Sequence, residues 1–235
     1  MRVLRIEHQG QGAALNAGIA ASSGRWLRFF DSDDVAAPGS MRRLASRMSG
    51  DRLIAYGATE VCDEQLTPYR RIESALQGNV VAACLLGRFE TRHVSMLFPR
   101  RVVEAAGPWD TQFRVSADWD FVLRALDHAE VSGDREVATL YRRNRRSVSG
   151  RANIEAGEES RRRMISRYFA RHPELRGSVL EREAWRAMYE DRGRAYWNAG
   201  QYGAAAQRMA EAAWRDPVGC VAATASRIRR RLQRA

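Results

Sequence analysis

Hydrophobic and polar positions change their period at about residue 150. Before that point, short apolar runs alternate with stretches of helical spacing. We expect strands at 3–6, 26–30, 53–57, 91–98 and 138–141, helices at 13–22, 38–48, 74–87, 101–106 and 117–130, and irregular chain at 58–70. Strands that alternate with helices over short connections predict an α/β fold with parallel neighbouring strands. The first such βαβ unit is expected over 3–30.

The pattern after residue 150 is helical. Ala, Arg and Glu dominate, and we expect helices at 155–170 and 179–197. One tetratricopeptide-like helix pair is predicted near 186–217, on the spacing of Tyr189, Gly193, Tyr196, Ala205, Met209, Ala212 and Pro217, with a turn at Gly200–Tyr202. The sequence therefore predicts an α/β domain over 1–150 and an all-α region over 151–235. A single pair cannot form a solenoid, so we expect it to pack on the main domain or on a partner.

Positive charge is concentrated in the helical region. Residues 1–141 hold 17 Arg against 18 acidic residues, whereas residues 142–235 hold 22 Arg against 10. All 39 basic residues are Arg, which we attribute to genome base composition. A solvated helical surface with internal ion pairs explains the charge most simply. Nucleic acid, anionic lipid or an acidic partner are the alternatives. Nucleic acid is disfavoured, because Trp185, Trp197 and Trp214 have helix-core spacing and do not interleave with the Arg run.

Apolar runs and cysteines bear on the compartment of the protein. No apolar run approaches the roughly 20 residues that a membrane-spanning helix needs, and the first residues do not resemble a signal peptide. Cys62, Cys84 and Cys220 lie far apart, which favours reduced thiols over disulfides or a structural zinc site. These features predict a cytoplasmic protein.

The stretch 25–38 holds the most informative polar residues of the chain. An apolar run, Trp26–Phe30, ends in three carboxylates, Asp31, Asp33 and Asp34, and Pro38 follows at the start of a predicted helix. A strand that delivers acids at its carboxyl end often builds a site in an open α/β sheet. Carboxylate oxygens in this arrangement suit Mg²⁺ or Mn²⁺ holding a phosphate. An acidic turn with a helix cap explains the same residues without a ligand.

Two further places suggest ligand contacts at helix starts. Gln9, Gly10 and Gly12 lie where a strand hands over to a helix, and free backbone N–H groups at such a position receive phosphate or sugar. Asp118 and Asp120 lie in the first turn of a predicted helix, where the helix dipole favours negative charge. A Gly-rich turn and an acidic first turn are weak signals when each is taken alone.

Taken together in chain order, these residues resemble the inverting family 2 glycosyltransferases. The first resembling stretch is HQGQGAALNAGIAASSGRWLRFFDSDDVAAP (8–38), with Gln9-Gly10, Asn16–Ile19, Asp31–Asp34 and Pro38 on the family motifs. The second is VSMLFPRRVVEAAGPWDTQFRVSADWDFVLRA (94–125), and Tyr141-Arg142 with Ser147–Ser149 resembles the closing loop of the family. The resemblance covers residues 1 to about 150.

The resemblance implies a GT-A fold, Rossmann-like in its sheet and flanking helices, and a nucleotide-diphospho-sugar donor with Mg²⁺ or Mn²⁺. Asp33 would bind the metal that bridges the diphosphate, and Asp31 would hold the ribose or share the metal. Asp118 aligns with the general base that deprotonates the acceptor hydroxyl, although a helix-capping role is compatible with that assignment. The remaining residues carried over are Gln9, Gly10 and Asn16 on the donor side and Asp34, Asp120 and Arg142 in supporting positions.

Four departures from the family pattern accompany the resemblance. Leu15 stands where many relatives have Arg, Ala117 replaces a Glu beside the base, and Asn144 replaces a frequent His. The chain also begins after the strands that hold the base and the ribose, about one βαβ unit of some 30 residues. We therefore expect an incomplete sheet. A misassigned start, a fragment, or a degenerate relative would each explain this.

Two classes of function remain open at this point. The leading hypothesis is a cytoplasmic sugar transferase in cell-surface glycan or polysaccharide synthesis, acting on a glycan or lipid-linked acceptor, with peripheral membrane contact through the basic end Arg227–Arg234. The alternative is a catalytically inactive, truncated remnant that acts as a binding or scaffold module through its helical tail. His8 and His93 receive no role from the sequence.

Overall fold

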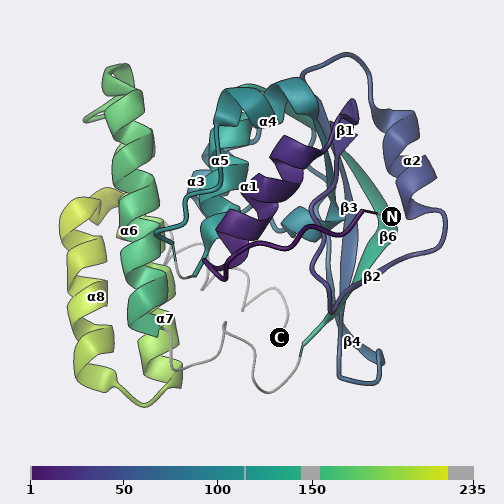
Figure 1. Ribbon diagram of the computed structural model, residues 1–235. Coiled ribbons are helices and arrows are strands. Elements are labelled where there is room, and N and C mark those ends of the chain that lie inside the picture. The colour runs from purple at the N-terminus through teal and green to yellow at the C-terminus, as the bar shows by residue number, and fades with distance from the viewer. Residues whose placement is uncertain (1, 114, 144–153, 222–235) are drawn as a thin grey trace. The chain divides into compact units, whose positions relative to one another are not determined.

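The computed structural model describes residues 2–113, 115–143 and 154–221 (Figure 1). By its internal contacts the chain divides into two compact units, 1–84 with 88–148 and 85–87 with 149–235. The first unit contains the sheet and the second contains the long helices. The predicted boundary between an α/β domain and an all-α region, near residue 150, falls among residues outside the described ranges.

The sheet is mixed and has its longest strands at the centre. Its order is β1 (Trp26–Leu27), β5 (Met96–Pro99), β3 (Leu53–Cys62), β6 (Glu130–Arg142), β2 (Val35–Ala36), and β4 (Pro68–Ile72) pairs with β3. Among the described strands, β3 and β6 are the parallel pair and every other pairing is antiparallel. β3 is buried along nearly its whole length, because strands flank it on both edges and helices cover its faces.

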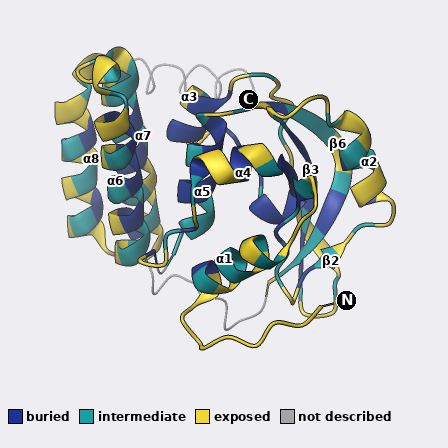
Figure 2. Cartoon of the chain, turned by 45° about the horizontal axis from the view of Figure 1, so that its top comes forward, coloured by how far each residue is buried: buried dark blue, intermediate teal, exposed yellow. Residues whose placement is uncertain are grey.

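Helices cover both faces of this sheet. α2 (Ser40–Arg47) lies on one face, and α1 (Gln11–Ala21), α4 (Arg100–Ala106) and α5 (Ala117–Leu126) lie on the other (Figures 1 and 2). The short α3 spans Val81–Leu85, and a 3₁₀ turn, η1, spans His93–Ser95.

The core differs between the two faces. Leu44 of α2 packs against Ala55, Leu97 and Ala138 on one side. On the other, four buried aromatic rings contact one another, from Phe29, Phe98, Trp109 and Phe121.

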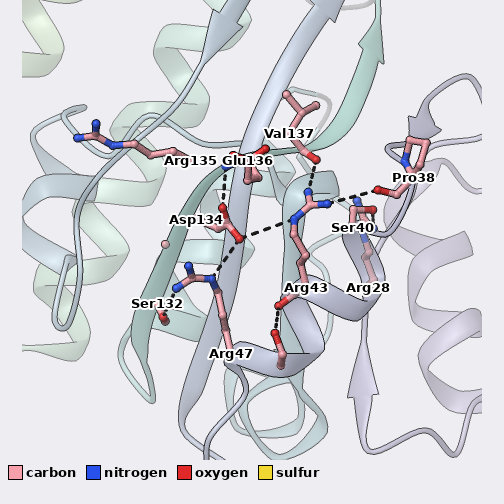
Figure 3. A network of polar contacts seen from close by, with 12 residues as sticks. Arg28, Pro38, Ser40, Arg43, Arg47, Ser132, Asp134, Arg135, Glu136 and Val137 are labelled. Atoms are coloured by element: carbon pink, nitrogen blue, oxygen red, sulfur yellow. Dashed lines mark hydrogen bonds and ion pairs between the residues drawn. The ribbon is translucent and has the colours of Figure 1, made fainter.

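α2 is tied to β6 by arginines. Asp134 of β6 receives Arg47 Nε at 3.2 Å and Arg43 Nε at 3.8 Å, while Arg43 Nη2 donates to the Val137 carbonyl at 2.5 Å (Figure 3). These contacts hold α2 against β6.

The second unit contains the helices that the sequence predicts. They are α6 (Ile154–Arg171), α7 (Val179–Asn198) and α8 (Tyr202–Arg215), with a 3₁₀ turn, η3 (Pro173–Leu175), between the first two. Ser178 caps α7 by accepting the Glu181 N–H at 3.2 Å. Gly193 permits the close approach of α8, because a Cβ there would lie 2.9 Å from Met209 Cε. The helix pair is present, and its identification as tetratricopeptide-like stays a prediction.

The fold class is confirmed, an α/β sheet with flanking helices followed by an all-α region, but several expected elements are wrong. Residues 3–6 form no strand, and Val3, Leu4 and Ile6 are exposed, since none of the described strands pairs with them. The expected parallel βαβ unit is therefore absent, and β1 pairs antiparallel with β5. The stretch expected to be irregular contains the second half of β3 and the start of β4.

Other boundaries differ less. The expected strand at 91–98 is divided into η1 and β5, the helix at 74–87 is reduced to α3, and the strand at 138–141 is the end of the longer β6. The strand at 26–30 is reduced to β1, and the helix at 38–48 begins only after Gly39, whose φ of 70° belongs to the left-handed region.

The described part of the chain contains no helix with both the length and the apolar character needed to cross a bilayer. All three cysteines lie among the described residues, and none of them forms a disulfide. The motif residues Asn144 and Ser147–Ser149 and the basic end Arg227–Arg234 lie outside the described residues.

Gly133 and Gly18 allow the effect of close packing on stability to be compared with the effect of helix propensity. A Cβ at Gly133 of β6 would lie 2.4 Å from Tyr56 Cζ, and Tyr56 is fully buried with its hydroxyl on the Leu76 carbonyl. We expect Gly133→Ala to lower the free energy of unfolding by about 1–3 kcal/mol in urea denaturation.

The matched control is Gly18→Ala, at an exposed position of α1 with no atom within 4 Å of the added Cβ. This change should raise the free energy of unfolding by about 0.5–1 kcal/mol, because Ala favours a helix over Gly. Equal stabilities for the two variants would contradict the close packing of β6 on Tyr56.

Candidate active site

A tight turn carries the three acidic residues that follow β1. The Asp34 N–H donates to the Asp31 carbonyl at 3.2 Å, so the chain reverses between these residues before β2 begins. Arg142, at the end of β6, holds the turn from the opposite side. Its N–H donates to Asp34 Oδ1 at 2.9 Å and its Nε donates to the Asp33 carbonyl at 3.0 Å. The position of this acidic turn is therefore set by the end of a central strand.

The three carboxylates of the turn have different surroundings. Asp33 is exposed, and no described residue pairs with its carboxylate. Asp31 is 23% exposed and accepts a hydrogen bond from Gln11 Nε2 at 2.6 Å. Asp34 is buried, and its Oδ2 has no hydrogen-bond partner. The exposed and half-buried groups, Asp33 and Asp31, are thus the ones available to a ligand.

Burial raises the pKa of Asp34 to about 6. The Arg142 N–H opposes this shift, and the negative charges of Asp31 and Asp33 add to it. A carboxyl with this pKa exchanges its proton near neutral pH, which distinguishes Asp34 from an ordinary surface acid.

Asp118, on α5, lies near the acidic turn through a shared contact with His93. It lies in the first turn of α5, which follows Ser116, a residue with a φ of 60°. A non-Gly residue in the left-handed region is uncommon and is often found beside a functional group. Asp118 Oδ2 lies 3.6 Å from His93 Nδ1, and Asp31 Oδ1 lies 3.9 Å from His93 Nε2. One imidazole therefore stands between the acidic turn and the start of α5.

His93 and the two carboxylates form an anion–cation–anion arrangement at neutral pH. Burial alone would lower the pKa of His93, but Asp118 and Asp31 outweigh it and raise that pKa to about 9. Burial acts to raise the pKa of Asp118, and the positive charge of His93 holds it below its usual value. Both distances exceed hydrogen-bond length, so these contacts are ion pairs. Asp118 is therefore ionised under the conditions in which a general base must accept a proton.

An aromatic wall borders this cluster. Trp109 is buried, stacks on Phe121 at a centroid distance of 4.4 Å and meets the His93 ring edge-on at 5.5 Å. Asn16 of α1 fixes the Trp109 backbone from both sides. Its Nδ2 donates to the Trp109 carbonyl at 2.9 Å and its Oδ1 accepts the Trp109 N–H at 2.8 Å.

The structure brings together some of the predicted residues and not others. Asp31, Asp34, Asp118 and Arg142 belong to one connected set, through the contacts above. Gln9 lies apart from it, with an exposed amide 3.5 Å from Glu7.

The remaining predicted residues have contacts of their own. Gly10, with a φ of 86°, precedes α1 as its N-cap. Asp120 is buried and accepts Arg124 Nε at 2.9 Å, and Arg124 in turn donates to the Ala106 carbonyl at the end of α4. The predicted donor-binding roles of Gln9, Gly10 and Asn16 and the supporting role of Asp120 stay predictions.

Gln11 and His93 are the residues that sequence reasoning missed. Gln11 directly follows the Gln9-Gly10 motif and is the first residue of α1, so a search of the first helical turn would have found it. His93 is 62 residues from Asp31 and 25 from Asp118 in the chain, and no local pattern marks it.

The carboxylates fit a metal ion that takes part of its ligands from a substrate. No group of three or more His, Cys, Asp or Glu side chains within the described residues is placed to hold a metal by itself. Mg²⁺ is commonly bound by one or two carboxylates together with substrate phosphates and water. Asp33, with a free carboxylate, and Asp31 beside it provide that number of ligands.

Comparison with known proteins identifies a family for part of this chain. Residues 1–107 match the family model described as Glycosyl transferase family 2. This segment is a family 2 glycosyltransferase domain. It contains the acidic turn, Gln11, Asn16 and His93, whereas Asp118 and Arg142 lie beyond the matched range.

Two curated relatives of the glycosyltransferase domain extend the comparison. The Succinoglycan biosynthesis protein ExoO of Rhizobium meliloti is 48% identical over 48 residues, 20% of this chain and 14% of that protein. An uncharacterized glycosyltransferase of Rickettsia felis is 25% identical over 144 residues, 58% of this chain and 24% of that protein. The chain thus spans a quarter or less of the length of these relatives.

Among solved structures, the chain is similar to two crystal structures of S. aureus TarS. The first has a TM-score of 0.42 at 11% identity, covering 78% of this chain and 36% of TarS. The second, of TarS 1–349, has a TM-score of 0.44 at 11% identity and covers 88% of this chain and 71% of that structure.

The Asn16 contacts predict a measurable loss of stability. Asn16→Ala leaves the Trp109 N–H and carbonyl without their partners, so we expect the free energy of unfolding to fall by about 1–3 kcal/mol. Urea denaturation followed by tryptophan fluorescence measures this. The control is Gln9→Ala, an exposed side chain whose removal should change stability by less than about 0.5 kcal/mol. An Asn16→Ala variant as stable as this control would contradict a structural role for the amide.

Proposed function

We propose that this chain transfers a sugar from a nucleotide-diphospho-sugar to an acceptor hydroxyl with inversion, in cell-surface glycan or polysaccharide synthesis. The observation that carries the proposal is the cluster formed by the acidic turn, His93 and Asp118 inside and just beyond the glycosyltransferase domain. The name of the ExoO relative, a succinoglycan biosynthesis protein, supports a polysaccharide product. Glycans and lipid-linked glycans are the proposed acceptors.

In this proposal the two halves of the cluster have different tasks. Asp118 accepts the proton of the acceptor hydroxyl while that oxygen forms a bond to the anomeric carbon of the sugar. The bond from the anomeric carbon to the diphosphate breaks on the opposite side, and the nucleoside diphosphate leaves with the electron pair. Asp33 and Asp31 would hold a divalent cation, Mg²⁺ or Mn²⁺, which offsets the charge of the leaving diphosphate when it is bound.

The supporting residues give each half its position. Arg142 uses its backbone and side-chain N–H groups to hold the acidic turn, so its guanidinium is committed to the Asp33 and Glu64 carbonyls. Gln11 holds the Asp31 carboxylate near the start of α1. The first backbone N–H groups of a helix have no acceptor within the helix, so this position suits a phosphate.

A second candidate function, a binding or scaffold module, is favoured by one feature of the helical unit. A pocket of about 230 Å³ is lined by Gly193, Arg194, Trp197, Asn198, Ala205, Ala206 and Met209 on α7 and α8. Trp197 is 62% exposed beside it. Under this alternative the chain binds no UDP at millimolar concentration in calorimetry, and saturable UDP binding would count against it.

A cytoplasmic location with peripheral membrane contact is part of the leading proposal. The contact is assigned to Arg227–Arg234, and the acidic lipids of an inner membrane face would supply the opposite charge. Co-sedimentation with anionic vesicles, with and without this segment, tests it.

Activity should depend on the two named carboxylates. We expect Asp33→Asn and Asp118→Asn each to reduce donor turnover with Mn²⁺ by about 10²–10⁴-fold, since one removes the free metal ligand and the other the base. Release of nucleoside diphosphate from a panel of nucleotide sugars measures this. Asp51→Asn is the control, because Asp51 forms a surface ion pair with Arg25. Full activity in either site variant would refute the assignment of that residue.

Metal and nucleotide should bind cooperatively. Because the described residues form no complete metal cage, Mn²⁺ alone is expected to bind weakly, and saturating UDP is expected to tighten it by roughly 5–150-fold. Calorimetric titration of Mn²⁺ with and without UDP measures the ratio, and Asp33→Asn should abolish it. Equal Mn²⁺ affinity in the two titrations would argue against a metal shared with the diphosphate.

A further inference from the structure

His93 is held by a backbone that has little freedom. The turn η1 is fixed through Val94, whose carbonyl accepts Arg28 Nε and Thr139 Oγ1, each at 3.0 Å. Ser95 adds a hydroxyl contact of 2.6 Å with Thr59 Oγ1. These partners come from the segment after β1, from β6 and from β3, so η1 is attached to three parts of the sheet.

The imidazole itself is equally confined. Its side chain is 8% exposed, and the Trp109 ring lies against it. Neither ring nitrogen has a hydrogen-bond partner among the described residues, and the carboxylates of Asp118 and Asp31 lie 3.6 Å and 3.9 Å from them. A polar ring this deeply buried, with each nitrogen directed to a different acid, has no contact that would explain it as an ordinary core residue.

The two carboxylates that face His93 come from separate elements and repel each other. Asp31 follows β1 and Asp118 begins α5, so no local structure sets the distance between them. The His93 ring lies between them and presents Nδ1 to Asp118 at 3.6 Å and Nε2 to Asp31 at 3.9 Å, so one fixed side chain gives each carboxylate a preferred direction. Asp31 has one further support, from Gln11.

We propose that His93 is a positioning residue of the transferase site, which sets the base Asp118 at a fixed distance and orientation from the donor-side carboxylate Asp31. The proposal rests on the function proposed above. His93 acts through its neighbours, because it is buried and contacts the two acids and the Trp109 ring. Its loss should misplace the base relative to the donor and leave the binding of each substrate largely intact.

The kinetic test compares His93→Phe with His93→Gln. Phe keeps a ring against Trp109 and has no polar atom, whereas Gln retains N–H donors. We expect His93→Phe to reduce kcat by about 10–100-fold with little change in the acceptor KM, and His93→Gln to recover part of the loss. Rates are divided by the number of UDP-binding sites found by calorimetry, so that misfolded protein does not count. His128→Phe, at an exposed histidine, is the control and should match the wild type.

A second test measures protein stability and does not require transferase activity. Double-mutant cycles on the free energy of unfolding pair His93→Phe with Asp118→Asn and, separately, with Asp31→Asn. We expect a coupling energy different from zero in both cycles. If the wild type turns over no nucleotide sugar, the proposed transfer fails and the cycles still decide the inference. Wild-type kcat per site in His93→Phe, or a missing coupling with either carboxylate, overturns the positioning role.

Discussion

The parallel pairing of β3 with β6 is the constraint on which the candidate site depends. It carries the end of β6 to the acidic turn, where the Arg142 N–H holds Asp34 Oδ1. The same strands anchor η1 through Thr59 and Thr139. The acidic turn and the turn that carries His93 are therefore both attached to one pair of strands. The acidic turn lies between the short strands β1 and β2, which pair with the longer strands β5 and β6.

The candidate site also depends on compensation of the negative charges of its carboxylates. Four carboxylates, on Asp31, Asp33, Asp34 and Asp118, gather around a region that is partly closed to water. His93 compensates two of them, the Arg142 N–H supports a third, and burial shifts the pKa of Asp34 towards neutral pH. The carboxylate of Asp33 has no such partner among the described residues. That difference supports the proposal that Asp33 binds the metal ion.

The helical unit shows how an Arg-rich sequence is accommodated in a folded core. Glu158 is buried and receives Arg162 at 3.0 Å and Arg208 at 2.8 Å, and Arg186 is buried between Glu190 at 2.9 Å and Asp216 at 2.8 Å. Such pairs add little net stability, but removing one partner leaves an uncompensated buried charge. They therefore specify how the helices pack. The sequence predicts internal ion pairs for part of the positive charge of this region, and Arg162, Arg186 and Arg208 form such pairs.

The sequence by itself determined what depends on near neighbours in the chain. Period and capping located α6 and α7 to within about one residue, and the order of motifs located the acidic turn and Asp118. Tertiary structure decided the rest, because it depends on partners distant in the chain. Residues 3–6 have the pattern of a strand and remain exposed without one to pair with. Gln11 and His93 entered the site only because the sheet brings Asp31 and Asp118 to them, and neither contact follows from local pattern.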